Sequence, residues 1–210
     1  MTRGGKYVLL ALLAGAAWVA ARDLIHGMRI ETARAVLDSS VHEGRDRLLA
    51  DWEHRARGNL SMLVDTSPPE ALALAALWID QAAGMPPPLR RRALLQADHL
   101  LAQVRVIRPA APGATLQEVR ADLIRFGRPR TATLAAFSRS YRQAGFMRDE
   151  GLWRIAFAAL YWRDLSEPTH KAVVDEALWL ARLDGRLRVA VDQLVTGTPL
   201  ALRVELRLMS

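Results

Sequence analysis

Hydrophobic side chains recur every three or four residues along most of this chain, a spacing that predicts α-helices. Glycine and proline interrupt the pattern at short intervals, as at Gly84, Pro109, Gly127 and Gly185. The predicted helices of the body cover residues 67–83, 89–107, 115–126, 131–143, 149–163, 166–183 and 186–195. Helices of this length joined by tight turns are typical of antiparallel hairpins that stack on one another. We therefore expect an all-α fold, with stacked helical hairpins in a domain spanning residues 65–210.

The last residues are open to two interpretations. Apolar side chains alternate with other residues in this segment, at Leu200, Leu202, Val204, Leu206 and Leu208. A period of two favours a short C-terminal strand. A lone strand lacks a pairing partner, however, so a helix remains an equal alternative.

The first 28 residues carry a longer apolar run. Arg3 and Lys6 precede a segment from Tyr7 to Ala21 that has no charged residue. A positive segment followed by a hydrophobic one targets a chain to the export machinery. The apolar sequence continues past residues 14–16 (Ala-Gly-Ala), which resemble a cleavage site. This continuation favours an uncleaved signal anchor, a transmembrane helix over residues 1–28. A cleaved signal peptide and a buried helix of the body are the alternatives.

The positive charges before the apolar run predict the orientation of the anchor. Cytoplasmic flanks of membrane spans are enriched in lysine and arginine. We therefore expect a single-pass protein of the inner membrane, with its body on the periplasmic, or extracytoplasmic, side.

Residues 29–64 predict a polar amphipathic stalk. Opposite charges stand three or four residues apart there, for example Glu43 with Arg47 and Asp51 with Arg55. Such pairs stabilise a solvated helix. An ordinary outer helix of the body is the alternative interpretation.

Positive charge is concentrated in the middle of the chain. The net charge is +7, and residues 84–148 hold twelve arginines against three acidic residues. This imbalance indicates an anionic partner, such as an anionic lipid, a polysaccharide or an acidic protein, although a solvated surface would look the same. If the hairpins stack in register, a basic groove is expected from Arg90, Arg91, Arg105, Arg108, Arg139 and Arg142.

Two tryptophans are further candidates for partner binding. Trp153 and Trp162 are nine residues apart, which places them on opposite sides of a straight helix. One is then expected in the core while the other faces outward. Core packing and a docking or sugar-stacking platform are the two interpretations.

The sequence offers little for catalysis, cofactors or metals. The chain contains no cysteine, and its five histidines include no pair three or four residues apart that a helical metal site needs. Asp175 and Glu176 are adjacent on a helix, so they do not converge as a catalytic pair. No nucleophile elbow or phosphate loop appears. We therefore expect a protein that is not an enzyme and binds no cofactor or metal.

Two segments share a spacing of small, large, variable and proline residues. They are Ala97, Leu101, Val104 and Pro109, and then Ala156, Leu160, Arg163 and Pro168. This spacing resembles the second helix of a tetratricopeptide repeat, in a degenerate form.

A longer stretch carries a more specific resemblance. Residues 151–185 include Trp153, Leu165, Pro168 and residues 176–180 (Glu-Ala-Leu-Trp-Leu). They resemble the C-terminal part of small membrane-anchored, tetratricopeptide-like proteins encoded among bacterial O-antigen and exopolysaccharide genes. The resemblance implies a scaffold or adaptor with protein partners, accessory to the assembly or export of cell-surface polysaccharide. A structural subunit of another membrane complex is the alternative. Nucleic acid is not expected as a partner, because the anchor places the body outside the cytoplasm.

Overall fold

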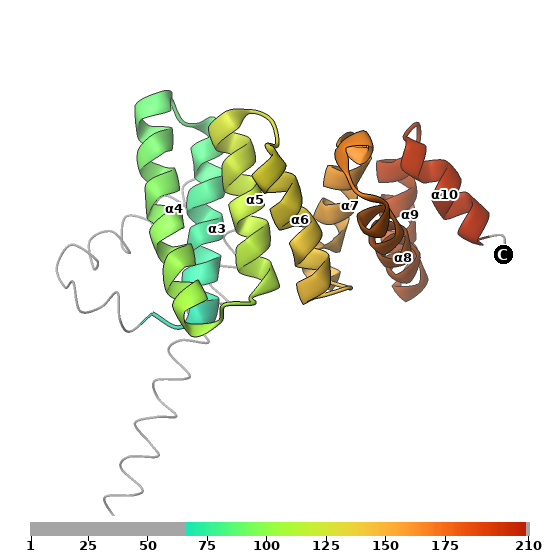
Figure 1. Ribbon diagram of the computed structural model, residues 1–210, viewed down its shortest axis with the longest axis horizontal. Helices are drawn as coiled ribbons and strands as arrows, with labels where there is room; N and C mark the ends of the chain where they lie inside the picture. Colours follow the sequence, from blue (N-terminus) through green and yellow to red (C-terminus); the bar gives the residue numbers. More distant parts are fainter. Residues whose placement is uncertain (1–65, 209–210) are drawn as a thin grey trace, which may run out of the picture. The chain divides into compact units, whose positions relative to one another are not determined.

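The computed structural model of this chain describes residues 66–208 (Figure 1). These residues form eight α-helices, one short 3-10 helix and no strand, so the predicted all-α class is confirmed for this part of the chain. The predicted anchor (1–28) and stalk (29–64) lie outside the described residues. None of the helices in residues 66–208 has the length and apolar character that crossing a membrane requires. The chain divides into two compact units, Met1–Ile107 and Arg108–Ser210.

The described part of the first unit is a hairpin of two helices, α3 (Pro68–Gly84) and α4 (Pro87–Ile107). Their facing sides bury leucine and alanine side chains, including Leu77 and Leu100. Fully buried alanines such as Ala97 let the two backbones approach closely. Burial of this shared apolar side is what holds the hairpin together.

The ends of these two helices differ from the sequence predictions in detail. The helix predicted over residues 67–83 begins at Pro68, and the side chain of Ser67 before it makes no capping hydrogen bond. Pro87 and Pro88 precede the helix predicted over residues 89–107, but in the structure they form the first turn of α4. Proline fits there because the first helical residues have no intrahelical partner for their N–H groups.

The second unit begins with the hairpin of α5 (Pro112–Phe126) and α6 (Thr131–Gln143). Gly127 ends α5 in the left-handed conformation, with φ of 68°, which a residue with a side chain rarely adopts. The predicted bounds of α6 match the structure. The buried side of this hairpin includes Leu116, Val119 and Phe137.

The rest of the second unit contains α7 (Arg148–Leu160), the 3-10 helix η2 (Trp162–Asp164), α8 (Glu167–Leu183), α9 (Gly185–Val195) and α10 (Pro199–Leu208). Helices α7, α8 and α9 pack on one another, and α10 packs on α8 and α9. Helix α8 also contacts α6, so one hydrophobic core is continuous through this unit.

The helix predicted over residues 149–163 is shorter in the structure. Helix α7 ends at Leu160, and the chain turns through η2. Leu160, the large residue of the second tetratricopeptide-like spacing, is consequently 78% exposed. In the first segment with that spacing, Ala97, Leu101 and Val104 are buried. The two segments therefore do not pack alike.

The predicted C-terminal strand is wrong, and the alternative of a helix is correct. Residues 199–208 form α10, which buries Leu200 and Val204 and leaves Leu202 and Leu206 exposed. A helix satisfies its backbone hydrogen bonds without a pairing strand. Side chains four residues apart lie on one side of a helix, so Leu200 and Val204 reach the core together.

Candidate functional site

The six predicted partner-binding arginines divide between the two units. Arg90, Arg91 and Arg105 lie on α4 of the first unit. Arg90 donates from Nη2 to the Met85 carbonyl oxygen over 3.0 Å, so it helps to hold the start of its own helix. Arg91 is exposed, and Arg105 is half-buried.

The other three arginines belong to the second unit. Arg108 is exposed just before α5, and on α6 Arg139 is half-buried whereas Arg142 is exposed. Within the described residues, the side chains of Arg139 and Arg142 make no hydrogen bond or ion pair with the chain. They are therefore available to an external anion. The groove that would combine all six arginines joins both units and stays a prediction.

Neither of the two predicted tryptophans presents an open ring. Trp153 is half-buried, and the Arg120 guanidinium lies 4.7 Å from its ring centre. Arg120 also donates to Oε2 of Glu150 over 2.7 Å, which fixes it there. Trp162 is 7% exposed and stacks on His170 with ring centres 3.9 Å apart. Core packing is thus the role of Trp162 in this structure.

A partly exposed aromatic pair, which the sequence pattern did not predict, lies elsewhere in the second unit. Phe146 lies between α6 and α7 and is 51% exposed, and its ring centre is 5.3 Å from that of Trp179 on α8. Leu183, one turn after Trp179, is also exposed. The only sequence signal was the spacing of Trp179 and Leu183, four residues apart on one helix.

A buried polar network joins α6, α7 and α8. Arg154 and Glu176 are both 0% exposed, with 3.2 Å between the Arg154 Nε and Glu176 Oε2. Tyr141 donates its hydroxyl to the same carboxylate oxygen over 2.9 Å, and the Met147 N–H donates to Glu176 Oε1 over 2.9 Å. Arg154 also donates to the Ala144 carbonyl oxygen over 3.1 Å, and its cation lies 3.5 Å from the Tyr141 ring centre.

Burial dominates the electrostatics of this network. It raises the pKa of the Glu176 carboxyl above its ordinary value, although Arg154, the Met147 N–H and the Tyr141 hydroxyl act in the opposite direction. Burial also raises the pKa of the Tyr141 hydroxyl, and the Glu176 carboxylate adds to that rise. Both carboxylate oxygens of Glu176 accept hydrogen bonds from this chain, so the network stabilises the fold.

Gly151 allows α7 to approach α8 at this network. A Cβ atom at residue 151 would lie 2.7 Å from Cδ1 of Leu180 and 3.5 Å from Cδ of Glu176. Leu180 is fully buried, so it has little room to move away. The absence of a side chain at Gly151 therefore sets the helix spacing at which Glu176 meets its partners.

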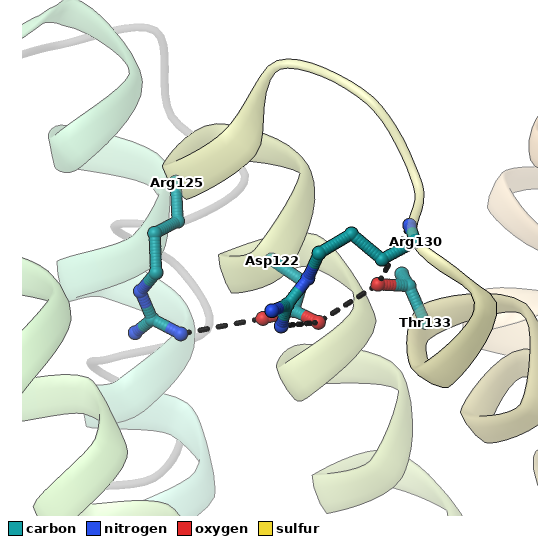
Figure 2. A network of polar contacts seen from close by, with 4 residues as sticks. All are labelled: Asp122, Arg125, Arg130 and Thr133. Carbon is teal, nitrogen blue, oxygen red and sulfur yellow. Dashed lines mark hydrogen bonds and ion pairs between the residues drawn. The ribbon is translucent and has the colours of Figure 1, made fainter.

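A second polar cluster fastens α5 to α6 (Figure 2). The Asp122 carboxylate accepts from the Thr133 hydroxyl over 2.8 Å, from Arg130 over 3.2 Å and from Arg125 over 3.3 Å. The Arg130 cation lies 3.7 Å from the ring centre of Phe126. Arg125 and Arg130, two basic residues of the arginine-rich segment, thus form contacts within this hairpin.

The described residues contain no group of three histidine, aspartate or glutamate side chains that could hold a metal ion. Asp175 and Glu176 do not converge, because Glu176 is turned into the network with Arg154. Comparison with family models, with curated proteins and with solved structures found no match for this chain.

Proposed function

We propose that this chain is a non-enzymatic, membrane-anchored helical scaffold that serves the assembly or export of cell-surface polysaccharide. The observation that carries the proposal is the difference between the charged side chains of the core and those at the surface. The buried charges of Arg154 and Glu176 bind each other and the backbone, whereas within residues 66–208 the half-buried Arg139 and the exposed Arg142 make no hydrogen bond or ion pair. A chain built in this way offers surfaces for docking.

The role in polysaccharide assembly or export is proposed because residues 151–185 resemble proteins encoded among bacterial O-antigen and exopolysaccharide genes. That stretch covers most of α7, all of η2 and α8, and the half-buried Trp179. Its tetratricopeptide-like character also belongs to the proposal, as do the inner-membrane anchor over residues 1–28 and the periplasmic position of the body. The alternative is a structural subunit of another membrane complex.

The first test is genetic. Deletion of the gene should lower the amount of surface polysaccharide, and the full chain should restore it. A chain without residues 1–28 should fail to restore it, because the body would lose its position at the membrane. Normal polysaccharide in the deletion strain would contradict the proposed pathway and favour the alternative complex.

The second test concerns Arg139 and Arg142 of α6. The double variant Arg139→Glu and Arg142→Glu should weaken binding of the full chain to anionic vesicles or acidic polysaccharide, and added salt should weaken wild-type binding. Arg186→Glu with Arg188→Glu on α9 is the control for the same change of charge, because both of those side chains are exposed. Equal binding by both double variants, or binding that ignores salt, would leave α6 without a role in anion recognition.

The third test concerns the anchor. Mass spectrometry of the protein extracted from membranes should recover the intact N-terminal peptide, because the apolar sequence continues beyond Ala16. A soluble mature chain that begins near residue 17 would show that the segment is a cleaved signal peptide.

A further inference from the structure

The turn between α5 and α6 presents an aromatic ring at the end of the hairpin. Phe126 is the last residue of α5 and is 42% exposed, and residues 127–130 (Gly-Arg-Pro-Arg) lead into α6. Gly127 adopts the left-handed conformation, and the ring of Pro129 fixes its own φ angle. The α5–α6 turn, residues 126–130, therefore holds its side chains in a fixed arrangement.

Two arginines are held beside Phe126 by a single carboxylate (Figure 2). Arg125 donates from Nη1 to Oδ1 of Asp122 over 3.3 Å, and Arg130 donates from Nη2 to Oδ2 over 3.2 Å. The Arg130 cation lies 3.7 Å from the centre of the Phe126 ring, and the Arg125 cation lies 5.9 Å from it. One negative charge thus fixes two positive charges, so this cluster keeps a net positive charge.

Arg128 adds a further positive charge to the turn. Its side chain is exposed and, within residues 66–208, makes no hydrogen bond or ion pair. No acidic residue follows Asp122 before Asp149, although six arginines lie between them. The positive charge of the turn is therefore not balanced by its sequence neighbours, and the turn attracts anions.

The exposed aromatic ring among these charges distinguishes between kinds of anion. A polysaccharide would stack on an open ring face, but the Arg130 cation covers one face of Phe126. At a lipid surface, phenylalanine enters the boundary between head groups and acyl chains. Arginines beside it reach the phosphate groups while their aliphatic stems lie along apolar surface. A rigid turn also loses little conformational entropy when it docks.

We propose that the α5–α6 turn docks on an anionic phospholipid surface. Phe126 lies at the boundary of the acyl chains, and Arg128 and Arg130 bind lipid phosphate groups. The site is separate from Arg139 and Arg142, which lie towards the other end of α6. It adds a lipid contact to the proposed scaffold, and it does not require the proposed N-terminal anchor.

The test uses a fluorescent label at the turn. The chain contains no cysteine, so Thr131→Cys, at an exposed position directly after the turn, can carry one environment-sensitive fluorophore in the full chain. Its emission should shift to the blue with vesicles that contain phosphatidylglycerol and not with pure phosphatidylcholine vesicles, and added salt should reverse the shift. A label at Gln193→Cys, exposed on α9, is the control and should not respond.

Substitutions in the turn should weaken the docking. A basic residue near an anionic surface favours docking roughly fivefold, so Arg128→Glu, which reverses one charge, should weaken it about 25-fold. Phe126→Ser should also weaken docking, because it removes the apolar contact. Arg188→Glu is the matched control, because Arg188 is exposed on α9, and it should dock as the wild type does.

Vesicle flotation separates this proposal from that of the anchor. A chain that floats with phosphatidylcholine vesicles, but whose turn label does not shift on anionic ones, would keep the anchor and overturn docking by the turn. A chain that floats only with anionic vesicles, and less in Arg128→Glu, would support the turn and contradict the anchor. An equal shift on both kinds of vesicle would overturn the proposal. A label that responds to acidic polysaccharide or to soluble glycerol phosphate, and not to vesicles, would also overturn it.

Discussion

The buried pair of Arg154 and Glu176 should respond very differently to single and double substitution. Glu176→Gln keeps the shape of the side chain and its acceptor for the Met147 N–H, but it leaves the Arg154 cation in the core without a counter-charge. Both side chains are 0% exposed, so water does not compensate. Breaking a buried pair in this way costs about 3–5 kcal/mol, a large part of the roughly 5–15 kcal/mol of a whole domain.

Removing both charges should restore most of that stability. Arg154→Met combined with Glu176→Gln leaves no buried charge, and the amide can still bind the Met147 N–H and the Tyr141 hydroxyl. The Ala144 carbonyl oxygen loses its donor, at a cost of about 1–3 kcal/mol. This loss is partly offset, because Nη2 of Arg154 is buried without a hydrogen-bond partner in the wild type. We therefore expect strong, favourable coupling between the two substitutions.

The pH dependence distinguishes the two single variants. In Arg154→Met the cation that lowers the pKa of Glu176 is gone, so burial raises that pKa further. The folded state then keeps a proton that the unfolded chain releases above its ordinary value of about 4.3. The stability of Arg154→Met therefore falls as pH rises above the ordinary glutamate value, and it continues to fall until the buried carboxyl ionises. The unfolding free energy of Glu176→Gln should have no pH dependence from this site, because an amide does not titrate and arginine stays charged.

Urea unfolding of the full chain in mild detergent, followed by far-UV circular dichroism, measures these differences. Wild type, both single variants and the double variant form one thermodynamic cycle. Losses that simply add in the double variant would refute the argument that the two charges stabilise each other. A loss below about 1 kcal/mol in Glu176→Gln would refute the claim that Arg154 needs a counter-charge.

Two further predictions concern helix contacts in the second unit. Gly151→Ala should lower the free energy of unfolding, measured by urea unfolding, by up to about 2 kcal/mol. Crowding of Leu180 costs about 1–3 kcal/mol, and the higher helix propensity of alanine offsets about 1 kcal/mol of it. Gly185→Ala, where no atom lies within 4 Å of the added methyl, should cause no loss, and equal losses in both variants would contradict this explanation. Asp122→Asn should weaken the contacts to Arg125 and Arg130, and the loss of about 1 kcal/mol should lower the thermal midpoint. Asp192→Asn on the exposed side of α9 is the control and should leave the midpoint unchanged.

The regular helices could be predicted because their signals are local. The period of apolar residues and a proline or glycine at each end place most helices within a few residues of their observed bounds, and those of α6 match fully. The break after Leu160 was missed because the apolar pattern runs on through Tyr161 and Trp162. Only tertiary contacts, such as the stacking of Trp162 on His170, reveal that the chain turns there.

The buried network could not be assembled from sequence, because its members are distant along the chain. Tyr141 and Glu176 are 35 residues apart, and a charged residue on an amphipathic helix is usually assigned to solvent. One local signal was available. Glu176 lies three residues after Val173 and four before Leu180, within the apolar side of α8, and Arg154 stands in the same way between Gly151 and Ala158. A charged residue inside an apolar stripe predicts a buried partner of opposite charge.

The network is polar because it binds backbone groups at the two ends of the loop between α6 and α7. The N–H of Met147 and the carbonyl oxygen of Ala144 flank this loop, and neither residue has a side chain that can cap a helix. Glu150 occupies the position from which a glutamate can reach back to the residue before its helix, yet it binds Arg120. Glu176 takes the Met147 N–H instead, and Arg154 donates to Ala144.

Helix α8 therefore supplies, from 29 residues along the chain, the acceptor for the N–H group at the start of α7. Sliding α8 by one turn, about 5.4 Å, would separate Glu176 from the Met147 N–H and from the Tyr141 hydroxyl at once. An apolar core would tolerate such a shift more readily, because hydrophobic contacts have little direction. The directional bonds of the network thus select one register among the packings that the leucine-rich sides of these helices would otherwise allow, and Gly151 sets the spacing at which that register forms.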